Sequence, residues 1–512
     1  MRIARLLLSL LPELTVGALL FSVAWLFLFL PSPLSGDDAL RHLAMARVLW
    51  DEGCCPGWDR FIYAGYLAEH RVDPWFLAHI TYLPFIGFET ALALKLYTLV
   101  SIAVLCIAFL SLVRSLGLKP LQMSFLLVVL LWGDALFFGR VLLARPFVLM
   151  TALVLVELQL ILKRRLLAVA ALIVAATLFS HLFVLPLGIA VAASGWMWSF
   201  GERNRAYQLL FVSLLAVAVG VLLHPHPWQY LHYLWFVFLR IPFSQSLPLG
   251  VELYSGFRMS LVPVATLGIA VLLLAAELQR DGFPALTKFH RQGGTMVFLL
   301  CTVLLFGLFL WARMIDLLWP LLIVLLAHVF IFCKPVLAEV QTVVCLQWRS
   351  MVLRGGALVC NMVLIYCIAV FSVKSTNIIR TDVLRSLESF AVLKLVPPGA
   401  NVLNPEWDPF PSFAVSQPYA RYATGMDPTF LFVQNAQGHD AIKLAYNSIL
   451  TAKYPLIDVG ALVAELRRQF PTSTHLILSQ RRFGNILPRV ALVPGVRQLS
   501  APGTAYALFA FE

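Results

Sequence analysis

Two adjacent carboxylates, Asp37 and Asp38, follow the first long apolar run of the sequence. Either one can act as a general base that takes a proton from a hydroxyl nucleophile. The structural alternative is that one of them caps a helix that runs to about Trp50 and favours its dipole. A cap needs only one carboxylate, however, and His42 follows Asp38 by one helical turn on the same face. Asp37 and Asp38 are therefore the candidate catalytic residues.

Further acids, histidines and arginines lie in turns between apolar runs, all on the same predicted side of a membrane. Such groups are costly to hold near hydrocarbon, so their gathering on one side indicates a reaction centre or a polar ligand. The candidate substrate-binding residues are Arg41, His42, His70, Asp73, Asp134, Arg140, Arg145, His181, His224, His226 and Arg313.

Several of these candidates also have a structural interpretation. Arg140 and Arg145 can bind phosphate oxygens bidentately or can snorkel to lipid headgroups. Asp134 lies inside an apolar run, where it serves a ligand or forms a salt bridge with Arg140. His181 is a single histidine, which is more often a packing residue than a ligand.

Two shorter motifs leave similar alternatives open. His224 and His226 are two residues apart and can bind metal or phosphate, although the sequence assures no third ligand. Arg313 and Asp316 share a short turn, where they form an ion pair or Arg313 contacts a phosphate.

The composition restricts the class of protein. Of 512 residues, 61% are hydrophobic and 12% are charged, whereas soluble domains have roughly 25% charged residues. These values indicate an integral membrane protein. The net charge of +12 then reflects basic turns on the cytoplasmic side rather than nucleic-acid binding.

Apolar runs predict about eleven transmembrane helices in a polytopic α-helical protein. The expected spans are Leu14–Leu30, Glu89–Val113, Leu121–Gly139, Phe147–Leu162, Leu166–Phe179, Leu182–Phe200, Leu209–Leu223, Leu261–Leu278, Met296–Leu310, Leu317–Phe332 and Ala357–Val373. The alternation of basic turns requires the segment 166–200 to cross twice. It also predicts a cytoplasmic amino terminus and an extracytoplasmic carboxyl terminus. The location that we expect is a bacterial cytoplasmic (inner) membrane.

Two regions outside the spans have patterns of their own. In the first outer loop, residues 31–88, Leu40, Leu43, Ala44 and Val48 predict a helix with one apolar face at the membrane surface. The tail, residues 374–512, predicts a soluble α/β domain. Its expected helices are Leu384–Leu395 and Val459–Phe470, and its expected strands are Asn401–Asn404, Thr474–Ser479 and Ala505–Phe511. Residues 1–373 thus form the predicted membrane domain.

Motifs in the tail leave two interpretations open. Asn404-Pro-Glu-Trp407-Asp408-Pro and Arg421-Tyr422, with Asp427-Pro428 after them, contain turn-forming and core-forming residues. Their alternative role is recognition of an acceptor.

The first outer loop resembles that of the GT-C superfamily of glycosyltransferases, most of all the protein mannosyltransferase and aminoarabinose transferase branch. The likeness rests on Asp37-Asp38-Ala39-x-Arg41, on Ala46-Arg47-x-x-Trp50-x-x-Gly53, on Tyr63-Ala-Gly65-Tyr66 and on Val72-Asp-Pro74-Trp75-Phe76. Val72-Asp73-Pro74 takes the place of the Lys-Pro-Pro that is usual in that branch.

This resemblance implies a GT-C-like enzyme, a hexosyl- or pentosyltransferase, that takes its sugar from a polyprenyl-phosphate donor. It places the base at Asp37 or Asp38. In some relatives an acid there contacts a divalent metal, so Mg or Mn is a possible cofactor at Asp37 or Asp38. Membrane lipid and a glycan, lipid or protein acceptor are the implied partners.

Two other classes of function stay open from the sequence. One is a flippase or transporter of lipid-linked sugar, although the cytoplasmic turns carry no matching acids and no pair of broken helices in related halves is evident. The other is a non-catalytic assembly protein of the cell envelope that keeps the fold and uses its tail for partners.

Overall fold

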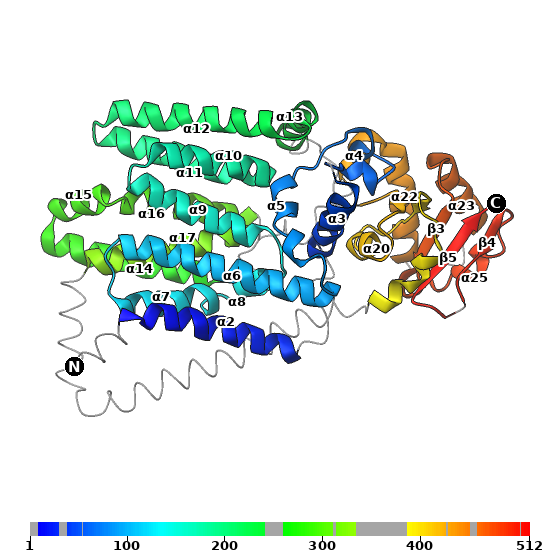
Figure 1. The fold of residues 1–512 in the computed structure, drawn as a ribbon, viewed down its shortest axis with the longest axis horizontal. Helices are drawn as coiled ribbons and strands as arrows, with labels where there is room; N and C mark the ends of the chain where they lie inside the picture. The colour runs from blue at the N-terminus through cyan, green and yellow to red at the C-terminus, as the bar shows by residue number, and fades with distance from the viewer. Residues whose placement is uncertain are drawn as a thin grey trace.

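Apolar segments form helices that lie side by side in one bundle, because a helix satisfies its own backbone hydrogen bonds in lipid. The computed structural model describes residues 9–29, 38–53, 55–240, 260–310, 314–333, 387–425, 429–450, 458–501 and 503–512. The bundle helices are α2 (Leu11–Phe29), α6 (Thr90–Ser115), α7 (Pro120–Trp132), α8 (Ala135–Val141), α9 (Phe147–Leu162), α10 (Leu166–Phe179), α11 (Val184–Ser199), α12 (Arg203–Leu223), α14 (Val262–Asp281), α16 (Gly294–Leu310) and α17 (Ile315–Phe332) (Figure 1).

Helix α17 is the centre of the bundle. Nearly all of its residues are buried, and it packs against α7, α8, α9, α14 and α16. Helices α12 and α14, in contrast, leave large apolar side chains such as Phe211, Leu222 and Leu272 exposed. Exposed apolar side chains on such helices are what a lipid-facing surface requires.

The expected apolar runs between residues 14 and 332 are helical. Within the described residues, five helices are long and apolar enough to cross a membrane, or six if α7 and α8 make one broken span. Shorter apolar helices include α2, α9, α10 and α16. The count of about eleven spans stays a prediction, and the expected span Ala357–Val373 lies outside the described residues.

The expected span Leu121–Gly139 is broken into two helices in the structure. Helix α7 ends at Trp132, and α8 begins at Ala135 with its axis turned by 80°. Trp319 of α17 packs where a Cβ at Gly133 would lie, and its indole N–H donates to the carbonyl of Leu130 at 2.8 Å. Asp134 then caps α8 by accepting the N–H of Phe137 at 2.8 Å. The break is therefore built from a glycine, a cap and a tryptophan.

The segment 166–200 contains two helices, α10 and α11, as the double crossing requires. Between them Ser180 is fully extended, and its hydroxyl accepts the N–H of Leu182 at 3.2 Å. A short 3₁₀ turn, His181–Phe183, then leads into α11. The extended serine ends one helix and starts the next.

The first outer loop folds over the bundle as α3 (Asp38–Glu52), α4 (Tyr66–Glu69) and α5 (Phe76–Ile80). Helix α3 lies between α6 and α5 of the first part of the chain and α20 (Phe410–Ser416) of the tail. Every residue from Ala39 to Ala46 is buried. The expectation of a helix with one apolar face at the membrane surface is therefore wrong, because the tail covers the face that the expectation left to solvent.

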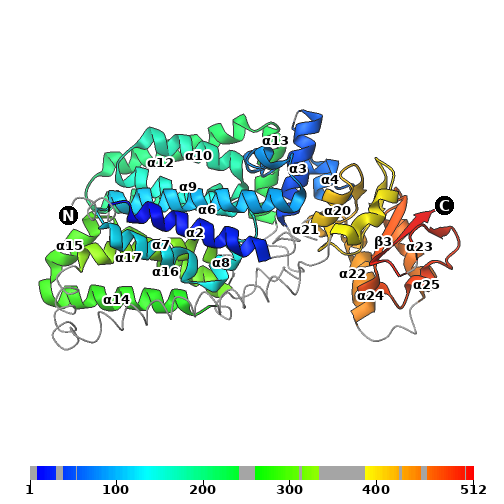
Figure 2. The same cartoon turned by 60° about the horizontal axis from the view of Figure 1, so that its bottom comes forward.

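The tail is a small α/β unit at the end of the molecule opposite α15 (Phe283–Arg291) (Figure 2). Its strands are β1 (Asn401–Leu403), β2 (Arg421–Tyr422), β3 (His475–Ser479), β4 (Val496–Gln498) and β5 (Tyr506–Phe511), and its helices are α20, α21 (Thr429–Gln434), α22 (Ala436–Leu450), α23 (Val459–Gln469), α24 (Gln480–Phe483) and α25 (Leu487–Val490). The sheet order is β2-β1-β3-β5-β4, with β2, β1 and β3 parallel and β5 antiparallel to β3 and β4.

The expected strands and the expected helix near Val459 are confirmed within a few residues. Strands β2 and β4 are short and carry little alternation, so the sequence did not predict them. Residues 387–395 form a 3₁₀ helix where an amphipathic α-helix was expected, and residues 384–386 lie outside the described part.

The first outer loop and the tail are joined by backbone contacts. Ile62 pairs with Tyr422 at the β2 edge, and the N–H of Tyr63 donates to the carbonyl of Tyr422 at 3.1 Å. Gly65 adopts φ +80°, and a Cβ there would lie 2.9 Å from the backbone of Leu431. The loop thus extends the tail's sheet by one bridge, and glycine permits the close approach.

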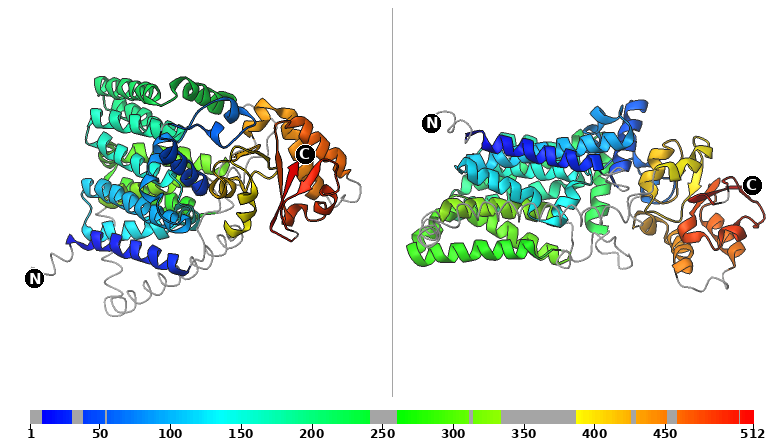
Figure 3. Two further views of the ribbon diagram at one scale, coloured as in Figure 1. Left: turned by 45° about the vertical axis from the view of Figure 1, so that its right-hand side comes forward. Right: turned by 90° about the horizontal axis from the view of Figure 1, so that it is seen from below.

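Helix α15 and the tail lie at opposite ends of the bundle (Figures 1 and 2), and both views of Figure 3 show the tail at one end of the bundle. Reporter fusions after Arg291 and after Ile378 should therefore report opposite compartments, with the reporter after Ile378 outside. Activity of an alkaline phosphatase and of a fluorescent protein at each position measures this. The same compartment for both positions would contradict the topology.

Candidate active site

A carboxylate and two guanidiniums meet where the first outer loop rests on the bundle. Asp38 is the first residue of α3, and Arg41 lies one turn later with its Nη2 3.0 Å from Oδ1 of Asp38. The Nη1 of Arg145 is 3.7 Å from Oδ2 of the same carboxylate. The side chains of Arg41, Arg145 and Asp38 are 9%, 7% and 21% exposed. Among the residues that the structure describes, two cations face one anion in this largely buried group.

The backbone at Ala144 directs Arg145 into this group. Ala144 has φ +53°, a conformation that is uncommon for a residue with a Cβ. Its carbonyl accepts the hydroxyl of Tyr82 at 2.5 Å, and Pro146 then starts α9. Strain of this kind persists only where the surroundings hold it, and it is frequent at functional sites.

Aromatic rings pack against the guanidinium of Arg41. The Cζ of Arg41 lies 5.0 Å from the ring centroid of Trp75 and 5.8 Å from that of Trp58. A guanidinium over an aromatic face is stabilised by the ring quadrupole, more strongly where water is excluded. Trp58 is fully buried, so the first outer loop fixes the position of Arg41.

Behind α3, three buried side chains form a hydrogen-bonded chain. Nδ1 of His42 is 2.8 Å from Nε2 of His79, and Nδ1 of His79 is 2.6 Å from Oδ2 of Asp73. The ring of His42 also stacks on that of Tyr82, with centroids 6.0 Å apart. Burial lowers the pKa of His42 well below its ordinary value, and the electrostatic effects of neighbouring His79, Arg41 and Arg145 lower it further.

The other predicted histidines lie around this chain. Nε2 of His224 is 2.9 Å from the carbonyl oxygen of Asp73, and Nε2 of His226 is 3.0 Å from that of Cys55. His181 packs edge-on against Trp75, with ring centroids 5.3 Å apart. Each of these rings therefore has a place in the packing of the first outer loop.

His70 belongs to a separate stack. Its ring lies 4.2 Å from that of Tyr66 and 4.7 Å from that of His232, nearly parallel to both. The hydroxyl of Tyr66 is 2.7 Å from Nδ1 of His232, which is in α13 (Pro227–Trp235). The stack ties the loop to α13.

Arg140 and Asp134 have partners of their own. Arg140 meets Asp316 through two hydrogen bonds, of 2.5 Å and 2.6 Å. Asp134 caps α8 and accepts the hydroxyl of Ser260 at 2.5 Å. The expected alternative of a salt bridge between Asp134 and Arg140 is therefore wrong, because Arg140 pairs with Asp316.

Asp37 and Arg313 lie outside the described residues. Among the residues that the structure describes, no three His, Cys, Asp or Glu side chains gather as metal ligands. The described partners of Asp38 are guanidiniums, which repel a cation. These residues alone do not supply a divalent-metal site.

The sequence pattern did not reveal His79, Tyr82 and Trp58. His79 follows Asp73 by six residues within an apolar stretch, and its signal was only an imidazole between apolar neighbours. In the sequence, Tyr82 and Trp58 have the pattern of ordinary aromatic core residues. Their roles depend on contacts with Ala144 and Arg41, which are distant in the sequence.

The motif that begins at Asn404 stabilises the tail. The side chain of Asn404 bonds to Thr424 and to the carbonyl of Glu406, and the carboxylate of Glu406 accepts the N–H of Ser479 at 3.2 Å. Arg482 bridges Glu406 and Asp408. These contacts support the structural interpretation of the motif.

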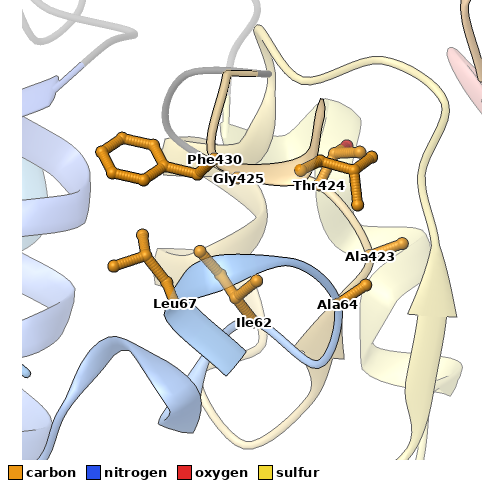
Figure 4. Close-up of a pocket in the computed structure, with 8 residues that line it drawn as sticks. Ile62, Ala64, Leu67, Ala423, Thr424, Gly425 and Phe430 are labelled. Carbon is orange, nitrogen blue, oxygen red and sulfur yellow. The ribbon is translucent and has the colours of Figure 1, made fainter. Parts of the chain in front are cut away.

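A small pocket lies at the joint between the loop and the tail (Figure 4). Ile62, Ala64 and Leu67 of the loop face Ala423, Thr424, Gly425 and Phe430 of the tail. The lining is apolar except for Thr424, and it includes none of the charged group around Asp38. The pocket is therefore separate from the candidate active site.

No protein-family model and no curated protein sequence matches the chain. Two solved structures from Archaeoglobus fulgidus are similar in fold. The oligosaccharyltransferase in its apo form has a TM-score of 0.56 at 10% identity, over 94% of this chain and 71% of that one. The oligosaccharyltransferase AglB in complex with an inhibitory peptide and a dolichol-phosphate has a TM-score of 0.57 at 11% identity, over 97% and 74%.

These similarities show the fold. The chain is a mostly helical protein with a small carboxyl-terminal sheet and the GT-C-like fold of an oligosaccharyltransferase. This fold is the one that the resemblance of the first outer loop implied, and membership of the GT-C superfamily stays a prediction. The mannosyltransferase and aminoarabinose transferase branch stays a prediction.

The low pKa of His42 makes stability depend on pH. In the unfolded chain a histidine titrates near 6.5. Below that pH the unfolded state takes up a proton that the folded state does not, so stability falls as pH decreases, by at most about 1.4 kcal/mol per pH unit for one group. The thermal midpoint in detergent should fall less steeply between about pH 7.5 and about pH 5.5 in His42→Gln than in the wild type. His224, whose pKa burial also lowers, retains part of the dependence. The same change of thermal midpoint with pH in the wild type and in His42→Gln would contradict the prediction.

Proposed function

We propose that this protein is a membrane glycosyltransferase that transfers a sugar from a polyprenyl-phosphate-linked donor to an acceptor. The observation that carries the proposal is the group of Asp38, Arg41 and Arg145, in a chain with a GT-C-like fold. AglB of the same fold was solved with a dolichol-phosphate and a peptide, which supports a lipid-linked donor here. The sugar is a hexose or a pentose, and the acceptor is a glycan, lipid or protein.

The chemistry follows from the charges. The acceptor nucleophile attacks the anomeric carbon while the bond from that carbon to the phosphate oxygen breaks, and the lipid phosphate keeps the electron pair. Arg41 and Arg145 stabilise the developing negative charge, because charge-assisted hydrogen bonds in a site shielded from water are strong. The carboxylate of Asp38 or Asp37 takes the proton of the nucleophile.

We propose that the reaction takes place at the outer face of a bacterial cytoplasmic membrane. The charged group lies at the end of the bundle that carries the tail, opposite the basic helix α15. In this arrangement residues 1–373 form the membrane domain and residues 374–512 the extracytoplasmic domain. The tail then closes over α3 from outside, where a lipid phosphate at the membrane surface is within reach.

Substitution of the first-loop acids tests the proposal. Asp37→Asn and Asp38→Asn are nearly isosteric, so both variants should fold. One of them should lose sugar transfer by about 10²–10⁴-fold, because general-base assistance is worth about that much. Binding of the donor should be kept or become tighter in Asp38→Asn, since the arginines lose their compensating anion. Purified protein and a panel of polyprenyl-phosphate-linked hexoses and pentoses give the rates.

Glu52→Gln is the matched control, because Glu52 is an acid on the same helix that pairs with Arg60. It should keep the wild-type rate. Transfer at the wild-type rate by the double variant of Asp37 and Asp38 would remove the catalytic role and leave helix capping. Movement of the donor lipid across vesicles without any transfer would support a transporter instead.

A further inference from the structure

The chain of Asp73, His79 and His42 ends one helical turn from the proposed catalytic acid. All three residues are buried, and His42 is 2% and His79 0% exposed. His42 and Asp38 are four residues apart on α3, a spacing that places their side chains on one helix face. The chain therefore begins in the first outer loop and reaches the face of α3 that carries the charged group.

Where both imidazoles are neutral, the hydrogen bonds determine the position of each proton. Oδ1 of Asp73 accepts the N–H of Trp75 at 3.1 Å, so Oδ2 is the oxygen that faces His79. A carboxylate only accepts, so Nδ1 of His79 donates and its Nε2 is left as an acceptor. Nδ1 of His42 must then donate to Nε2 of His79. The remaining ring nitrogen of His42, Nε2, carries the lone pair.

This lone pair is free to accept. Nε2 of His42 has no hydrogen-bond partner among the described residues. The rings of Trp75 and Tyr82 confine the imidazole, with centroids 5.8 Å and 6.0 Å away. A confined neutral imidazole with an open Nε2 is the arrangement of a proton acceptor.

A proton acceptor at this position can receive a proton from the charged group of Asp38, Arg41 and Arg145. Asp38 faces Arg41 and Arg145, and nearby positive charge weakens a carboxylate as a base. A proton that Asp38 takes from the nucleophile is therefore held weakly. The two guanidiniums also oppose a positive charge that stays on His42. A proton that moves on through His79 places the charge beside the carboxylate of Asp73 instead.

We propose that Asp73, His79 and His42 form a proton relay that receives the proton of the acceptor nucleophile from the first-loop carboxylate. This inference rests on the proposed function and adds three positioning and proton-transfer residues to it. The bond between the nucleophile and its hydrogen breaks as the bond to the anomeric carbon forms. The proton passes through Asp38 to Nε2 of His42, Nδ1–H of His42 shifts toward Nε2 of His79, and Nδ1–H of His79 shifts toward Oδ2 of Asp73. The reverse path releases it after the product leaves.

Asp73→Asn tests the relay with almost no change in shape. The N–H of Trp75 holds Oδ1, so the amide nitrogen of the variant must face His79 and donate to it. Nδ1 of His79 then accepts, its Nε2 donates, and Nδ1 of His42 accepts. Nε2 of His42 is left protonated and cannot take a proton. We expect the turnover number to fall by about 10²-fold, with the KM for the donor unchanged.

A second variant separates proton transfer from structure. His42→Ala opens a space between Trp75 and Tyr82 that added imidazole can fill. We expect imidazole to restore part of the turnover of His42→Ala but not that of Asp38→Asn. Pyrrole has the same ring size but no basic nitrogen, and it should restore nothing. His290→Gln is the control for loss of a hydrogen-bonded histidine, at the opposite end of the bundle, and should keep the wild-type rate.

The outcomes distinguish the relay from the proposed function. A wild-type protein that transfers none of the panel sugars would overturn both. Active Asp73→Asn and His42→Ala variants beside an inactive Asp38→Asn variant would overturn the relay and leave the proposed function in place. Equal restoration by imidazole and pyrrole would show that His42 only fills space, and would also overturn the relay.

Discussion

The burial of two guanidiniums beside a single carboxylate is the constraint on which the rest of the structure depends. Removing such charges from water costs several kcal/mol per ion, which mutual attraction offsets only where the geometry is well held. The surrounding elements supply that geometry. Asp38 begins α3, the positive φ of Ala144 directs Arg145, and Trp75 lies against Arg41. Within the described part of the chain the guanidiniums outnumber the carboxylate at this point, and an anionic ligand would balance that charge.

The tail and the first outer loop form one cover over this group. Helix α20 packs on α3, and the backbone of the loop pairs with the edge of the tail's sheet at Ile62 and Tyr422. Aromatic side chains of both parts share one core, in which Trp58 lies against Phe410. A cover of this kind excludes water, and the exclusion strengthens each charge interaction beneath it. The same packing buries α3 from Ala39 to Ala46, whereas its last turn at Trp50 is exposed.

The sequence predicted most of the helices, because a long apolar run in lipid satisfies its backbone hydrogen bonds by forming a helix. It also predicted that Asp38, Arg41, His42, Asp73 and Arg145 belong to one region, since each follows an apolar run on the same side. It did not predict the break at Gly133, which depends on Trp319 of a distant helix. Arg140 pairs with Asp316 and His79 joins His42 to Asp73, and these pairings across the fold have no local pattern. The burial of α3 was not predicted for the same reason, because α3 packs on its second side against α20 of the tail, which is distant in the sequence.

A density map of the protein with bound polyprenyl phosphate tests the central claim most directly. The account predicts the phosphate between the guanidiniums of Arg41 and Arg145, next to Asp38, with the lipid chain leaving toward the bundle. Arg145→Gln should remove that density, whereas Arg47→Gln, on the same helix as Arg41 but bonded to Thr90, should retain it. A phosphate bound elsewhere, for example at Arg140 after separation from Asp316, would contradict the assignment of the site.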